Sequence, residues 1–123
     1  MAINKIPESF TYAANAAADH SSNIHKFAAV NSSGDIALCG DGAQMLGTII
    51  EVNTSGNPVT VQFGGIAKVK LGGTVAAGGA VASGASGVGV AAAAGDYVFG
   101  QALNGGVSGD IISVAVVGST RHA

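Results

Sequence analysis

The stretch Gly72–Gly95 (GGTVAAGGAVASGASGVGVAAAAG) constrains the fold of this chain more than any other, because it lacks charged, aromatic and proline residues. A membrane helix needs about 20 predominantly apolar residues, but Leu, Ile and Phe are absent here, and each glycine costs about 1 kcal/mol relative to alanine in a helix. A flexible linker would be richer in Ser and poorer in Val. Valines instead recur between the glycines, at Val75, Val81, Val88 and Val90. The stretch therefore predicts very short strands joined by tight turns, in which glycine adopts positive φ without strain.

Segments on both sides of this stretch alternate between apolar and polar residues, which indicates half-buried strands. Val59–Phe63 and Ala67–Leu71 precede it, and the two lysines of the second segment mark a solvent-facing side. Tyr97–Leu103 follows it, and Asn-Gly-Gly then turns the chain. Three earlier apolar segments bounded by turn residues are also expected to be strands: His25–Val30, Asp35–Cys39 and Met45–Val52.

These patterns predict an all-β fold, a small β-barrel or sandwich of roughly eight short strands. A chain of 123 residues fits a single domain. We expect residues 24–118 to form this β domain, residues 1–23 to form an extended N-terminal arm, and residues 119–123 to form a loose C-terminal tail.

The predicted arm, Met1–Asn23, carries four large apolar side chains among polar residues. A proline prevents a helix from running through it, although Ala13–Ala18 can form a short helical turn. Two interpretations stay open, a frayed terminus and an arm that becomes ordered on a partner surface. On the second, the contact residues are the four large apolar side chains: Ile3, Ile6, Phe10 and Tyr12.

The last predicted strand, Ile111–Val117 (IISVAVV), is apolar on both faces. One face can fill the core, and the other needs a cover, either another layer of the same domain or a neighbouring subunit. Charged residues make up only 10% of the chain, so a surface covered by other subunits is expected. We assign the subunit interface to Ile112, Val114 and Val116.

The charge pattern argues against a nucleic-acid or membrane partner. The five basic residues form no dense cluster in the sequence, as a nucleic-acid footprint would. The N-terminus lacks the basic start and long apolar run of a signal peptide. A single cysteine, Cys39, excludes an intramolecular disulfide and is compatible with folding in a reducing cytoplasm.

No constellation of residues predicts catalysis, a metal or a cofactor. Asp19, His20 and His25 lie in one short segment, but a metal needs three or four convergent ligands, so solvated loop histidines are expected. Cys39 lies in an apolar run and is expected to be a buried, inert thiol. No glycine-rich stretch has the spacing of a phosphate-binding loop. We therefore expect a protein that is not an enzyme and has no cofactor.

The order of features over Gly47–Val117 resembles the capsid decoration (cement) proteins of tailed bacteriophages. The segments that carry the resemblance are GTIIEV, VTVQFGGIAKVKLGG, GGAVASGASGVGV, AAGDYVFGQAL and GDIISVAVVG, about two thirds of the chain. The resemblance is one of composition and of the order of these segments, not of an invariant catalytic motif.

The resemblance implies a barrel-like β domain that forms homotrimers at three-fold or quasi-three-fold positions of the capsid. It implies a structural virion protein, made in the host cytoplasm, that binds the outside of the head. There it clamps neighbouring major capsid proteins and stabilises the expanded head. Met1–Asn23 would take the place of the arm that some relatives order on the capsid. The alternative is a carbohydrate- or host-surface-binding β-module of a phage head fibre, for which exposed aromatics would be the sign.

Overall fold

The predicted all-β fold is confirmed by the computed structural model, which describes residues 10–121, with side chains placed for residues 10–117. The described chain contains ten strands and one short 3-10 helix, η1 (Ala85–Gly87), where roughly eight strands were expected. The strands are β1 (Thr11–Asn15), β2 (Phe27–Val30), β3 (Ile36–Leu38), β4 (Gly47–Glu51), β5 (Pro58–Gln62), β6 (Ile66–Lys70), β7 (Ala80–Ser83), β8 (Gly89–Ala91), β9 (Tyr97–Ala102) and β10 (Ile111–Arg121).

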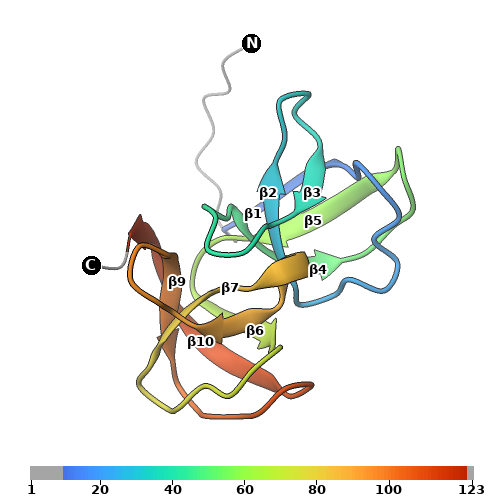
Figure 1. Cartoon of the computed structure of the whole chain (residues 1–123). Helices are drawn as coiled ribbons and strands as arrows, with labels where there is room; N and C mark the ends of the chain where they lie inside the picture. The colour runs from blue at the N-terminus through green and yellow to red at the C-terminus, as the bar shows by residue number, and fades with distance from the viewer. Residues whose placement is uncertain (1–9, 122–123) are drawn as a thin grey trace.

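The strands form two antiparallel sheets of five strands each, one from each half of the chain (Figure 1). The first sheet has the order β1-β5-β4-β2-β3, and the second has the order β6-β10-β9-β7-β8. Each sheet curls so that a parallel bridge joins the residue after its first strand to its third strand. These bridges are Ala16 to Ile36 and Leu71 to Gly89. Each bridge brings the two edge strands of its sheet together at one residue pair.

The two halves repeat one topology, which the sequence analysis did not predict. Numbered within its own half, each sheet has the strand order first, fifth, fourth, second, third. Gly47 and Gly100 hold matching positions, because a Cβ on either would collide with the backbone carbonyl of the paired last strand, at Gln62 and at Ala115. The chain is therefore a structural duplication.

The halves share a core. The buried cluster of the second half contains Phe27, Cys39 and Met45 from the first half. Phe27 of β2 meets Phe99 of β9 edge to face, with ring centroids 5.0 Å apart, a favourable geometry for aromatic pairs. A smaller cluster, which includes Ile36, Ile49 and Val61, fills the first half. The two sheets are packed into one body.

The glycine-rich stretch Gly72–Gly95 folds as its composition predicts. It contains β7, η1 and β8, joined by short turns. Two of its turn glycines, Gly78 and Gly95, have φ angles of 83° and 89°, which residues other than glycine rarely adopt. No helix within residues 10–121 is long and apolar enough to cross a membrane.

The predicted arm and tail are corrected at their inner ends. Thr11–Asn15 is strand β1, antiparallel to β5, so the short helical turn that Ala13–Ala18 could have formed is absent from the described structure. Alanine's helix propensity is overridden by pairing with β5, whose residues lie from 43 (58 − 15) to 51 (62 − 11) positions further along the sequence. Residues 11–23 therefore belong to the β body. The tail residues up to Arg121 extend β10, where Arg121 pairs with Tyr97. Ile3 and Ile6 lie outside the described residues.

Candidate interaction surface

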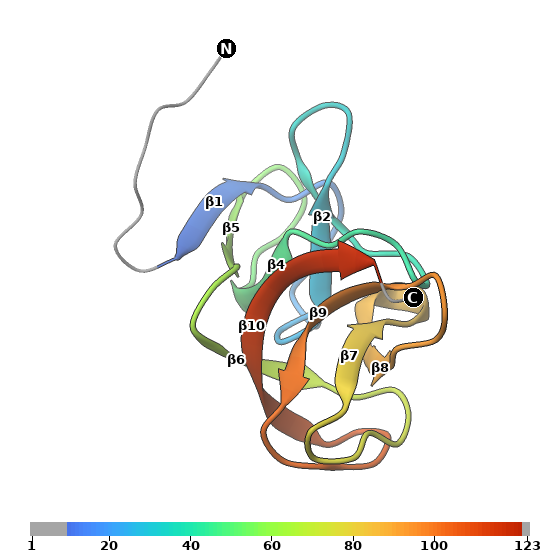
Figure 2. The ribbon, with the colours of Figure 1, turned by 90° about the vertical axis from the view of Figure 1, so that its left-hand side faces the viewer.

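The outer side of β6, β10 and the end of β9 forms an uncovered sheet face, which we call the β6–β10 face. Its register places Ile66 opposite Ala115, Lys68 opposite Ser113, and Lys70 opposite Ile111. Figure 2 shows β10 as a long curved strand on the side turned to the viewer. The face is made of Ile66, Lys68, Lys70, Gln101, Leu103, Ile111, Ser113, Ala115 and Val117.

Large apolar side chains on this face are open to solvent. Ile66 is 64% exposed, Val117 is 63% exposed, and Ile111 and Leu103 are about half exposed. Exposed apolar groups that gather on one face mark an interaction site more often than scattered ones do. The β6–β10 face is therefore the best candidate for a protein contact in the described part of the chain.

The exposed residues of β10 are the neighbours, one position away, of the residues predicted to form the subunit interface. Ile112 is 2% exposed and Val114 is fully buried, and both belong to the protomer's own core. Val116 is partly buried against the same core. Successive strand residues point to opposite faces, so the residues left for a partner are Ile111, Ala115 and Val117. Because the segment is apolar on both faces, its sequence does not reveal which set points inward.

An aromatic pair at the junction of the two halves extends the apolar end of this face. Phe10 is 51% exposed and meets Phe63 edge to face, with centroids 6.4 Å apart. The Phe10 ring lies so close over Gly64 that a Cβ there would collide with it. The next glycine, Gly65, accepts a 2.9 Å hydrogen bond from the Val116 amide. We call the group Phe10, Phe63, Ile66 and Val117 the junction patch.

Of the residues predicted to contact a capsid, Phe10 and Tyr12 are described. Phe10 belongs to the junction patch, whereas Tyr12 is half-buried on β1 opposite Val61.

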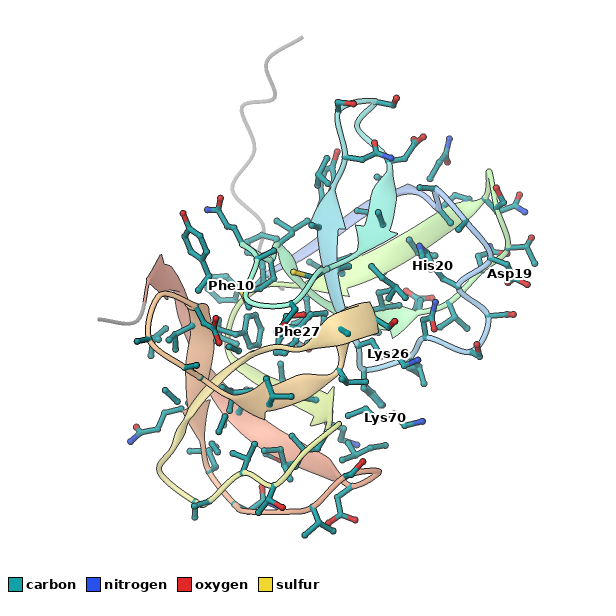
Figure 3. The ribbon with its side chains drawn as sticks, viewed as in Figure 1. Phe10, Asp19, His20, Lys26, Phe27 and Lys70 are labelled. Carbon is teal, nitrogen blue, oxygen red and sulfur yellow. The ribbon has the colours of Figure 1, made fainter. Side chains whose placement is uncertain are left out.

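The other end of the β6–β10 face is cationic. The Lys70 amide donates a 2.9 Å hydrogen bond to the carbonyl of His25, which brings the segment before β2 against β6. Figure 3 shows Lys26 and Lys70 extending from the same side of the molecule. Lys68 is close enough to His25 to affect its titration. We call His25, Lys26, Lys68 and Lys70 the cationic corner; its charge at neutral pH is carried by the three lysines.

His20 is buried, against the expectation of a solvated loop histidine. It is 2% exposed, and its Nε2 donates a 2.8 Å hydrogen bond to the Ile36 carbonyl. Its Nδ1 accepts from Asn23 Nδ2 at 3.0 Å, and Asn23 Oδ1 accepts from Lys26 Nζ at 3.2 Å. Both ring nitrogens are thus used to hold the segment between β1 and β2, because a buried polar group needs partners.

The thiol of Cys39 and the other potential metal ligands form no reactive site in the described residues. Cys39 is buried as expected, its Sγ lies 3.4 Å from the Ala43 carbonyl, and burial raises the pKa of its thiol. Within residues 10–121, no group of three or more His, Cys, Asp or Glu side chains could hold a metal ion. A shallow depression of about 240 Å³ is lined by Ala29, Val30, Gln44, Met45 and Leu46, which carry no ionisable group.

The pKa of His25 offers a direct test of the cationic corner. Burial, with the charge of Lys68 as a second cause, lowers the pKa of His25 below its ordinary value of 6.5. As pH falls, His25 is protonated at a higher pH in the unfolded chain than in the folded chain. The folded state therefore loses stability as pH falls below about 6.5. In NMR titrations, Lys68→Gln should raise the pKa of His25. Lys26→Gln should leave intact the part of the pKa decrease that Lys68 causes. An unchanged His25 titration in Lys68→Gln would contradict the arrangement.

Comparison with known proteins identifies the architecture. No protein-family model matches the chain, and no curated protein matches its sequence. A solved structure does match, that of the head fiber gp8.5 N base in bacteriophage phi29. The TM-score is 0.74 at 15% sequence identity, over 91% of this chain and 98% of that one. The two proteins share a fold over nearly their whole lengths.

Proposed function

We propose that this chain is a structural protein of a bacteriophage head. The observation that carries the proposal is the fold shared with the phi29 head-fibre base over 91% of the chain. The uncovered β6–β10 face supports it, because a protein that works by contact needs apolar surface that is buried on assembly. The sequence resemblance to decoration proteins points to the same part of the virion.

In the proposed mechanism, the protein binds the outer surface of the expanded head and bridges neighbouring major capsid proteins. Binding only the assembled state raises the free energy needed to separate the capsomers. A contact of about 800 Å² per subunit would have an ordinary size, and three linked copies in a homotrimer would bind far more tightly than one. The proposal includes no catalytic step and no cofactor.

The second candidate is the base of a head fibre, and the name of the phi29 structure favours it. A fibre base shares the head-binding step but holds a further fibre segment instead of bridging capsomers. A carbohydrate- or host-surface-binding role would favour exposed aromatics, and among the described aromatic residues only Phe10 is more than half exposed. A base that attaches to the head is thus the better supported form of this alternative.

The test is binding to emptied heads of the phage that carries this protein. We expect the full chain to co-sediment with the heads and to raise the temperature at which they come apart. Head binding without added stability would favour the fibre base over the bridging role. A full chain that stays in the supernatant would reject both.

Removing residues 1–9 tests the arm in the same assay. The deletion ends before β1, because a deletion up to residue 23 would remove a strand of the first sheet. We expect the truncated chain to keep its β-sheet circular dichroism spectrum but to bind heads at least tenfold more weakly, since Ile3 and Ile6 would no longer contribute apolar contacts. Wild-type affinity of the truncated chain would refute the arm's role.

A further inference from the structure

We propose that the cationic corner, His25, Lys26, Lys68 and Lys70, docks a protein surface that presents carboxylates around apolar side chains. The proposal rests on the proposed function, in which that surface belongs to the capsid. It adds the chemistry of the partner and the end of the β6–β10 face that meets it.

The corner is assembled by the tertiary fold. Lys68 and Lys70 lie two residues apart on β6 and point outward, while Val69 between them is fully buried. The hydrogen bond from the Lys70 amide to the His25 carbonyl brings His25 and Lys26, which precede β2, against β6 (Figure 3). All three lysines of residues 10–121 thus lie together at the end of the β6–β10 face opposite the junction patch. In the sequence, more than 40 residues separate Lys26 from the other two.

Within residues 10–121, no salt bridge joins a lysine of this corner to an acidic side chain. Asp19, Asp96 and Asp110 accept hydrogen bonds from backbone amides of their own turns. In the described part of the chain, the one hydrogen bond made by a lysine amine of the corner is that of Lys26 to the neutral side chain of Asn23. Three positive charges on one corner repel like charges and attract opposite ones. An acidic partner surface would therefore supply the complementary charge.

The surroundings of the corner favour a protein partner over nucleic acid. Ile111 lies directly opposite Lys70 on β10 and is 51% exposed. Leu103, whose amide donates to the Ser113 carbonyl at 2.9 Å, adds a second exposed apolar group to the same face. Single-stranded nucleic acid binding uses aromatic platforms beside a long cationic groove, and the exposed aromatic residue Phe10 belongs to the opposite end of the face. Apolar groups edged by a few charges suit the core and rim of a protein interface.

The test compares the full chain with the triple variant Lys26→Gln, Lys68→Gln, Lys70→Gln in head binding at low and high salt. The variant changes the net charge from −2 to −5, that is −2 − 3. The control Ser32→Asp, Ser33→Asp, Ser55→Asp also reaches −5, at exposed positions in the turns between β2 and β3 and between β4 and β5. At low salt we expect the triple variant to bind roughly tenfold or more weakly, mostly through slower association. The control should bind like the wild type, and added salt should reduce the difference because it screens charges.

A double variant, Lys68→Gln with Lys70→Gln, leaves the Lys26–Asn23 hydrogen bond in place and covers the case in which the triple variant does not fold. If the wild type binds heads and the folded lysine variants bind equally well, the corner has no docking role although the proposed function stands. If the wild type does not bind heads, the proposed function fails. The corner is then judged by retention on immobilised poly-L-glutamate against double-stranded DNA. Stronger retention on glutamate that the lysine variants lose would support a carboxylate partner, and any other pattern would overturn it.

Discussion

Gly100→Ala is expected to destabilise the protein by about 3 kcal/mol or more, because overpacking that meets backbone cannot relax cheaply. Gly100 lies in β9, between β10 and β7. A Cβ at this position would collide with the backbone carbonyl of Ala115 and would lie 2.9 Å from Val114 Cγ1. To avoid this collision, β9 and β10 would have to separate, which would break the hydrogen bonds between the two strands. Since a small domain has only about 5–15 kcal/mol of stability, such a loss is large.

The measurement is urea denaturation followed by circular dichroism. Gly40→Ala is the control, because the nearest atom to its new Cβ would be Ala43 Cβ at 3.9 Å, an ordinary contact, and we expect a change within about 0.5 kcal/mol. Gly47→Ala should behave like Gly100→Ala, since it holds the matching position in the first half. Equal midpoints for Gly100→Ala and Gly40→Ala would show that the close approach in β9 is wrong.

Two substitutions on β10 are expected to have different effects: Val114→Asp should impair folding, and Val117→Asp should impair self-association. Val114 is fully buried in the core, so a carboxylate there loses its hydration without a partner, and we expect a loss of about 4 kcal/mol or more. Val117 is 63% exposed on the β6–β10 face. Aspartate at Val117 should leave the unfolding free energy within about 0.5 kcal/mol of the wild type but should weaken self-association through the junction patch.

Two measurements distinguish these effects. Chemical denaturation gives the free energy of unfolding of each variant, and sedimentation equilibrium gives the association state of those that fold. A folded Val114→Asp variant would mean that β10 faces the other way. A wild type that sediments as a monomer at all concentrations would reject self-association through this patch, while leaving capsid binding to the separate test with heads.

The alternating segments were the most predictable part of the fold. Ala67–Leu71 corresponds to β6, with its lysines outward and Val69 buried, as its period of two requires. Ile111–Val117 corresponds to the first part of β10, but its inward face was assigned to the interface. A strand with apolar residues on both faces has no polar side to fix its orientation, so only packing against β6 and β9 decides it.

Features that depend on distant contacts could not be predicted. The sequence of Thr11–Asn15 resembles an alanine-rich arm, and its strand character comes from pairing with β5. The cationic corner requires His25 to meet β6, which nothing in the local sequence signals. His20 was expected in solvent because its partner Ile36 is 16 residues away.

The duplication did leave a signal. Thr54–Val61 (TSGNPVTV) and Val107–Val114 (VSGDIISV) share a Ser-Gly turn before an alternating strand, and their glycines Gly56 and Gly109 both have positive φ. A search for internal repeats with such loose spacing would have suggested two similar halves. The weak identity between the halves explains why composition and periodicity alone suggested a single barrel or sandwich.

The shared core has a consequence for how the chain gains and loses its structure. Phe27, Cys39 and Met45 of the first half fill the core of the second, with Phe27 against Phe99. A second half cut from the chain would open a hole where these side chains lie, and the first half would expose them to water. Although each half has a complete strand order, neither is a self-sufficient folding unit. The chain should melt in one cooperative transition, so two halves with the same topology form a single thermodynamic unit.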